Sequence, residues 1–213
     1  MSKYNMIRWS GFSLILAGVL FALATVIHPS NETVNNILTQ EGRLITGHWL
    51  YTFYSVFLLL GLSGIYAAHS TALGRIGLAG FLLTFMGTLF YAVSSDYGFN
   101  APVLARVAPE ALQAINAYPP VIAMDVLMVI CMLPGFILLG IAVQRSRVLP
   151  AWSGLFIAIG WPLYIIIGAL SLSLFEPLWY LAILMSILTG IGLAGIGYAI
   201  WAVKREILQP AGC

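Results

Sequence analysis

Five ionisable side chains stand at the ends of long apolar stretches, where they could bind a ligand or move a proton. They are His28, His48, Asp96, Asp125 and Glu176. His48 and Asp125 are the candidates for catalysis, because a carboxylate can orient and charge an imidazole that transfers a proton. Asp125 lies six residues after Pro119, about 9 Å along a helix at 1.5 Å per residue, where an unpaired carboxylate is costly. The sequence therefore predicts a polar ligand site that contains His48 and Asp125.

A structural alternative is that these five residues mark the boundary between membrane and water and pair with one another.

His28, His48, Asp96 and Glu176 also carry atoms that bind metals, but their spacing matches no known closed site. A haem needs two axial ligands at matching depth on facing helices. Only His28 and His48 share a depth, and that pair is shallow, because His69 falls at the opposite end of the apolar stretch from His48. We therefore predict no metal and no cofactor.

Other chemistry has weaker support. Met124, Met128 and Met132 recur every four residues, and a line of thioethers can bind Cu(I). Methionine is also common in apolar packing, so we interpret this stripe as core. No Gly-x-Ser-x-Gly elbow is present, and every glycine cluster lies inside an apolar stretch rather than in a phosphate-binding loop.

Membrane helices must position these residues. Of the 213 residues, 61% are hydrophobic and only 8% are charged, whereas a soluble domain has about 25% charged residues. Six stretches have the roughly 20 residues that cross a ~30 Å hydrocarbon core. They are Trp9–Ile27, Trp49–Ala68, Ile76–Ser94, Val121–Val143, Trp152–Leu174 and Leu178–Val203. We predict an all-α polytopic bundle of six transmembrane helices, with residues 1–213 as a single domain.

Glycine pairs repeat along the chain. Gly11 and Gly18 recur as Gly80 and Gly87, and a looser copy runs over 152–160. Seven residues make about two helical turns, so each pair lies on one face, where another helix can approach closely. Three copies predict a duplicated antiparallel hairpin in pseudo-threefold order. The hairpins span approximately 8–69, 73–146 and 150–205.

Basic residues predict the orientation. If both termini are cytoplasmic, seven Lys and Arg residues face the cytoplasm and only Arg43 and Arg106 face outward. Two outer connections are then long, and we predict surface helices over Asn31–Gln40 and Pro109–Asn116. Long loops on one face often carry function. The net charge of +2 reflects this topology, and we predict no nucleic-acid partner.

Several motifs resemble those of uncharacterised bacterial six-helix integral membrane proteins. They are Gly47-His48-Trp49-Leu50, Gly64-Ile65-Tyr66-Ala67, Gly74-Arg75-Ile76-Gly77-Leu78-Ala79-Gly80-Phe81 and Val148-Leu149-Pro150-Ala151-Trp152. The resemblance implies a bacterial inner (plasma) membrane and brings no activity with it.

Three classes of function follow. The first is binding or processing of a small lipophilic molecule in an outward-facing polar pocket, with enzymatic activity left open. The second is an accessory subunit for a larger membrane complex or a homo-oligomer, which predicts an uncovered strip at Ser186, Gly190 and Ala194. The third is a transporter, which the apolar midplane disfavours. Membrane lipids are expected partners in every case.

Overall fold

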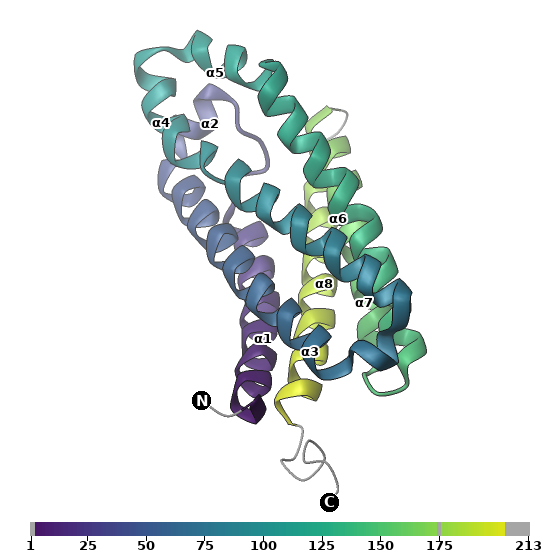
Figure 1. Cartoon of the computed structure of the whole chain (residues 1–213). Helices are drawn as coiled ribbons and strands as arrows, with labels where there is room; N and C mark the ends of the chain where they lie inside the picture. The colour runs from purple at the N-terminus through teal and green to yellow at the C-terminus, as the bar shows by residue number, and fades with distance from the viewer. Residues whose placement is uncertain (1–2, 174–175, 203–213) are drawn as a thin grey trace, which may run out of the picture.

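The computed structural model describes residues 3–173 and 176–202, which are helical apart from short connections and contain no strand (Figure 1). The helices are α1 (Lys3–Ile27), α2 (Val34–Thr39), α3 (Glu41–Ser94), α4 (Tyr97–Val107), α5 (Pro109–Asn116), α6 (Pro119–Ser146), α7 (Ala151–Ser173) and α8 (Leu178–Trp201). The predicted all-α class is confirmed. Leu174 and Val203, the predicted ends of two spans, lie outside the described residues.

Five helices, α1, α3, α6, α7 and α8, are long and apolar enough to cross a membrane. α3 has 54 residues and would measure about 80 Å if it were straight. Its backbone leaves helical geometry at His69 and Gly74, and the φ of 61° at Gly74 suits glycine because it has no Cβ. Tyr66 and Phe81 then stack across the turn with ring centroids 5.0 Å apart. Two of the predicted stretches are therefore the two antiparallel halves of α3.

The long helices pack side by side in a closed ring. α1 lies between α8 and the first half of α3, and α6 lies between α7 and the second half of α3. Glycines make these approaches close: any side chain at Gly18 would meet the backbone of Gly190, and any at Gly87 would meet Met132. The first glycine pair thus packs on α8, whereas the second packs on α6.

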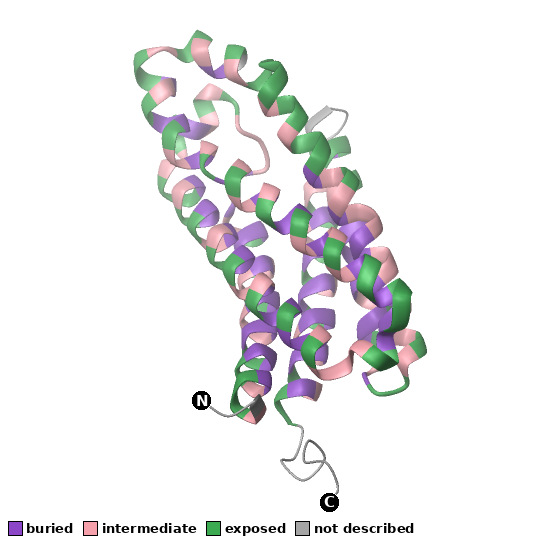
Figure 2. Cartoon of the chain, in the orientation of Figure 1, coloured by how far each residue is buried: buried purple, intermediate pink, exposed green. Residues whose placement is uncertain are grey.

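The strip on α8 is covered within the chain. Ser186 is fully buried and Gly190 lies against Gly18 of α1. The uncovered surface expected for an accessory subunit is therefore not found at Ser186 or Gly190, and Ala194 is half-buried. Buried residues lie along the sides of the long helices that turn toward one another (Figure 2). Met128 and Met132 are also buried.

Three short helices, α2, α4 and α5, form a cap over one end of the ring (Figure 1). They enclose a second small apolar core of Ile37, Leu44, Ala101, Ala105 and Leu112. Arg43 donates to the carbonyl of Ile27 at 2.9 Å, and Arg106 pairs with Glu41. The predicted helix Pro109–Asn116 is confirmed and the one over Asn31–Gln40 is shorter, while α4 was not predicted. We call this end of the molecule the cap end.

Candidate functional site

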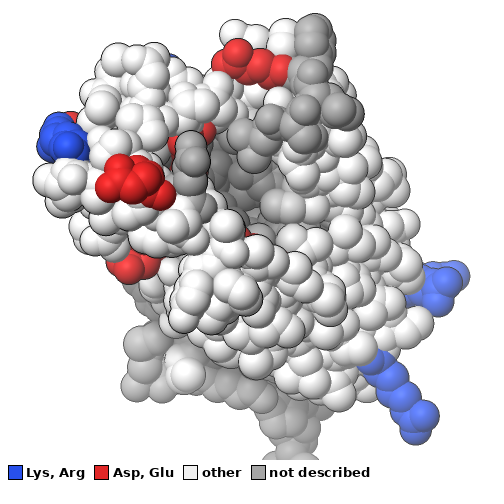
Figure 3. All heavy atoms as spheres, turned by 90° about the horizontal axis from the view of Figure 1, so that it is seen from above, with Lys and Arg blue, Asp and Glu red and all other residues white. Residues whose placement is uncertain are grey.

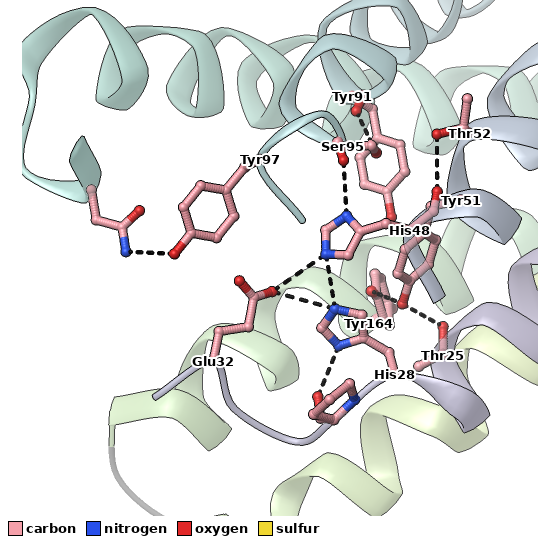
Figure 4. Close-up of polar contacts among 12 residues, drawn as sticks. Thr25, His28, Glu32, His48, Tyr51, Thr52, Tyr91, Ser95, Tyr97 and Tyr164 are labelled. Carbon is pink, nitrogen blue, oxygen red and sulfur yellow. Dashed lines mark hydrogen bonds and ion pairs between the residues drawn. The ribbon is translucent and has the colours of Figure 1, made fainter. Parts of the chain in front are cut away.

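Three side chains from different parts of the chain meet at the cap end (Figure 4). His28 directly follows α1, Glu32 lies in the connection to α2, and His48 lies on α3. The Nε2 atoms of the two histidines are 3.2 Å apart. Glu32 Oε1 lies 3.3 Å from His28 Nε2 and 3.8 Å from His48 Nε2. We call these three residues the His–Glu cluster.

Two glycines make room for the imidazoles. A Cβ at Gly47 would lie 3.0 Å from His28 Cδ2. A Cβ at Gly98, in the first turn of α4, would overlap the ring of His48. The cap can therefore lie over the two histidines only because both positions lack a side chain. Each histidine is only 7% exposed.

The hydrogen bonds of the two rings fix their tautomers. His28 Nδ1 lies 2.8 Å from the carbonyl oxygen of Pro29, and His48 Nδ1 lies 3.0 Å from that of Ser95. A carbonyl oxygen only accepts, so each Nδ1 carries the proton and donates it. In the neutral rings both Nε2 atoms then bear lone pairs. Three acceptors, two nitrogens and a carboxylate oxygen, therefore face one another.

Glu32 stays ionised in this setting. Burial raises the pKa of its carboxyl group, but hydrogen bonds and positive charge from His28 and His48, when these rings are protonated, lower it more, to about 2. The Glu32 side chain is 30% exposed, whereas those of the histidines are 9% exposed. Glu32 is therefore the member of the cluster through which the site reaches the surface.

A chain of buried hydroxyls lies beneath the cluster. Thr25 donates to the carbonyl of Phe21 at 3.0 Å, so it accepts from Tyr51 OH at 3.2 Å. Tyr51 OH and Tyr164 OH are 3.1 Å apart. Since the proton of Tyr51 goes to Thr25, Tyr164 must donate to Tyr51. The polar cluster thus has a hydrogen-bonded floor that joins α1, α3 and α7.

Aromatic rings form the walls of the site. Tyr51 lies 5.7 Å from His28 and 6.3 Å from His48 between ring centroids. Trp179 of α8 lies 6.2 Å from His28, and Phe99 of α4 lies 6.2 Å from His48. The surroundings of the cluster are therefore apolar rings on several sides, with the polar atoms at its centre.

Glu176, a predicted site residue, lies beside the cluster rather than in it. Its carboxylate accepts from Ser30 Oγ and, at 3.4 Å, from Asn31 Nδ2. These two residues directly precede Glu32, so Glu176 braces the segment that carries the Glu32 ligand atom. A bracing role differs from the direct ligand contact that we predicted.

The two aspartates do not join the histidines in any contact among the described residues. Asp96 is exposed and accepts from Asn100 at 3.3 Å. Asp125 is exposed and accepts from Ser94 Oγ at 3.0 Å, while His48 Nδ1 is bonded to Ser95. The expected pairing of His48 with Asp125 is therefore corrected. Equal depth along the helices placed both residues at the cap end, but the rotation of α6 turns Asp125 outward.

Glu32 is the site residue that sequence reasoning missed. It lies in a polar connection with no helical or strand periodicity, within a sequon-like Asn31-Glu32-Thr33. The one indication in the sequence was its spacing of four residues from His28. In a helix this spacing would place both side chains on one face, although the segment is not helical in the structure. Our prediction of no metal considered Asp96 and Glu176 and left Glu32 out.

Negative charge gathers at the cap end. Six acidic residues lie there, against two arginines: Glu32, Glu41, Asp96, Glu110, Asp125 and Glu176 against Arg43 and Arg106. Seen from this end, acidic side chains are spread over a face with a hollow near its middle (Figure 3). Both arginines are engaged in holding the cap. The field at this end therefore favours cations.

Comparisons of the chain with protein-family models, with curated proteins and with solved structures found no match.

Proposed function

We propose that this chain is an integral membrane protein that crosses the bilayer six times as three hairpins, with both termini in the cytoplasm. The fold-back of α3 supports six crossings, because it turns one long helix into two spans. Arg8, Arg75, Arg145 and Arg147 lie away from the cap end, which supports a cytoplasmic location for that side. The resemblance noted above favours a bacterial inner membrane.

The function we propose is the binding of a small lipophilic molecule at the cap end, with its polar head at the His–Glu cluster. The observation that supports this proposal is that, with both rings neutral and protonated at Nδ1, two imidazole nitrogens and a carboxylate oxygen face one another in a largely buried place. In that protonation state the arrangement is costly unless something bound between or above these atoms supplies positive charge. The apolar body of the molecule would lie against the rings of Phe99 and Trp179.

The alternatives have less support. A transporter usually has ionisable groups or broken helices near the membrane midplane, whereas here the ionisable cluster lies at one end of the ring. Several buried hydroxyls inside the ring bond to their own helix, as Ser55 does to Tyr51 and Thr88 does to Thr84. An accessory subunit needs an uncovered helix face, and the α8 strip is packed within the chain.

A matched pair of amphiphiles tests this proposal. Decylamine and decanoate share a similar apolar tail and carry heads of opposite charge. The protein in lipid nanodiscs should be stabilised against heat by at least one of them, and saturation at 100 times Kd gives about 2.7 kcal/mol. Asp125→Asn should keep this shift and His48→Gln should lose it. No shift with either probe, or an equal shift in His48→Gln, would contradict the proposal.

A further inference from the structure

We propose that the His–Glu cluster binds one divalent first-row transition-metal ion, of the zinc or ferrous type, through His28 Nε2, His48 Nε2 and Glu32 Oε1. The inference rests on the proposed function, because the ion would be the group that receives the polar head of the lipophilic molecule. It also replaces our earlier prediction of no metal, which omitted Glu32.

The spacing of the three atoms matches ligands of a single ion. Their separations of 3.2, 3.3 and 3.8 Å form a nearly regular triangle. The point equidistant from the three atoms lies about 2.0 Å from each, and zinc binds His nitrogen and carboxylate oxygen at about 2.0–2.2 Å. An ion at this point therefore reaches all three ligands without any movement of the side chains.

The same distances argue against two other occupants. A proton shared between charged groups draws its partners to about 2.7–2.9 Å, and Glu32 Oε1 lies farther than this from both Nε2 atoms, at 3.3 and 3.8 Å; only the 3.2 Å between the two nitrogens is short enough for a hydrogen bond. An ammonium nitrogen donates over about 2.7–3.2 Å, so it cannot lie between atoms whose common centre is this close. It would have to stand above their plane. A metal ion is the occupant that fits within the triangle.

The types of the ligand atoms select the class of metal. Calcium and magnesium take oxygen ligands almost throughout, whereas two imidazole nitrogens and one carboxylate are typical of zinc and non-haem ferrous sites. Three protein ligands also leave at least one coordination position for water or for another molecule. The polar head that binds there would be a metal-coordinating group, such as a carboxylate.

The hydrogen bonds that hold the two histidine rings are arranged as in metal sites. A metal-bound histidine usually donates its other ring N–H to a carbonyl or carboxylate, which fixes the tautomer and the ring orientation. His28 does so to Pro29 and His48 to Ser95. Both rings thus present Nε2 with its lone pair toward the same point, and this is the tautomer that coordination requires. Residues far apart in the chain supply these two arrangements independently.

The charge of the cluster also fits a dication. Glu32 supplies the single negative charge of the ligand set, and no Lys or Arg among the described residues forms an ion pair with it. The surplus of acidic residues at the cap end raises the local concentration of cations. The floor of the cluster, Tyr51 with Thr25 and Tyr164, is neutral and hydrogen-bonded, so no positive group opposes the ion.

Metal titration of the full chain tests the inference. The protein, purified in detergent and freed of metal with a chelator, is titrated with Zn²⁺ against a chromophoric competitor, and with Co²⁺ by visible absorption. We expect one ion per chain. His28→Gln, His48→Gln and Glu32→Gln should each weaken binding by more than the roughly 10–100-fold loss that follows when only a hydrogen-bond partner of a ligand is removed. His69→Gln and Asp125→Asn are the matched controls and should bind as the wild type does.

Glu32→Gln keeps the test decisive if a histidine variant fails to fold, because Glu32 is half-buried in a connection outside the helices, whereas both histidines are buried. Wild-type protein that binds neither ion stoichiometrically, or Glu32→Gln that binds both with unchanged affinity, would overturn the metal site. The two amphiphiles then separate this inference from the proposed function. Decanoate that stabilises only metal-loaded protein supports both. If the wild type binds neither ion but decylamine stabilises it through Glu32, the proposed function stands and the metal site is overturned, while no effect of either probe overturns the proposed function alone.

Discussion

Gly98→Ala is the substitution through which the packing of the cap over the cluster can be tested most sharply. The added methyl group would overlap ring atoms Cγ, Cδ2 and Nε2 of His48. Those atoms belong to a buried ring held at its Nδ1 by Ser95, so the ring cannot rotate away without losing that hydrogen bond. Either the imidazole or the start of α4 must move.

The expected loss can be worked out from two opposing effects. Overpacking a closely packed site costs about 1–3 kcal/mol, and replacing a helical glycine by alanine returns about 0.5–1 kcal/mol. The net expectation is a loss of about 0–2.5 kcal/mol in the free energy of unfolding. Because His48 would also leave its ligand position, Zn²⁺ affinity should fall by roughly 10–100-fold, as for other changes that disturb the orientation of a ligand.

Gly42→Ala is the matched control for this change. Gly42 also lies in a helix at the cap end, and a Cβ there would have no atom within 4 Å. It should therefore gain about 0.5–1 kcal/mol from helix propensity alone and leave metal binding unchanged. Thermal unfolding and Zn²⁺ competition are measured on both variants. If Gly98→Ala were as stable as Gly42→Ala and bound Zn²⁺ as tightly as the wild type, the structure of the cap over His48 would be wrong.

Three further predictions follow from the fold and the charges. Gly18→Leu should lower the yield and melting temperature in detergent, because a branched side chain would meet the backbone of Gly190; wild-type behaviour would contradict the packing of α1 on α8. Asp125→Asn should change the free energy of unfolding by less than ~0.5 kcal/mol, and its effect should add to that of His48→Gln, since the two residues bond different partners. A coupling energy well above ~0.5 kcal/mol would show that His48 and Asp125 do interact, against the structure. A cysteine introduced at Asn36 should react with a membrane-impermeant reagent from outside the cell, and one at Ser146 should not; the reverse pattern would invert the topology.

The helices could be predicted from the sequence because the length and hydropathy of a segment are enough to identify a membrane-spanning helix. Long apolar runs mark the spans, and Gly74 and Pro150 mark the connections at the end away from the cap. The close approach of Gly18 to its neighbour also followed from the seven-residue glycine spacing. Which helix each strip would face did not follow, because a smooth face is complementary to more than one partner.

The site was only half predictable. His28 and His48 stand at the ends of apolar stretches, where the sequence makes their depth clear, and they do meet. Depth alone does not give the rotation of a helix about its axis, and so Asp125 was placed at the right height on the wrong side. Glu32 belongs to a connection whose path depends on the cap, including the bracing by Glu176, and no local pattern encodes that path.

X-ray absorption at the zinc edge of the metal-loaded wild-type protein tests the central claim most directly. Two imidazole nitrogens and one carboxylate oxygen should surround the ion at about 2.0–2.2 Å, and His48→Gln should lose one imidazole from this shell. A shell of light atoms without imidazole scattering, or one that stays the same in His48→Gln, would show that the ion binds elsewhere and that the His–Glu cluster is not a metal site.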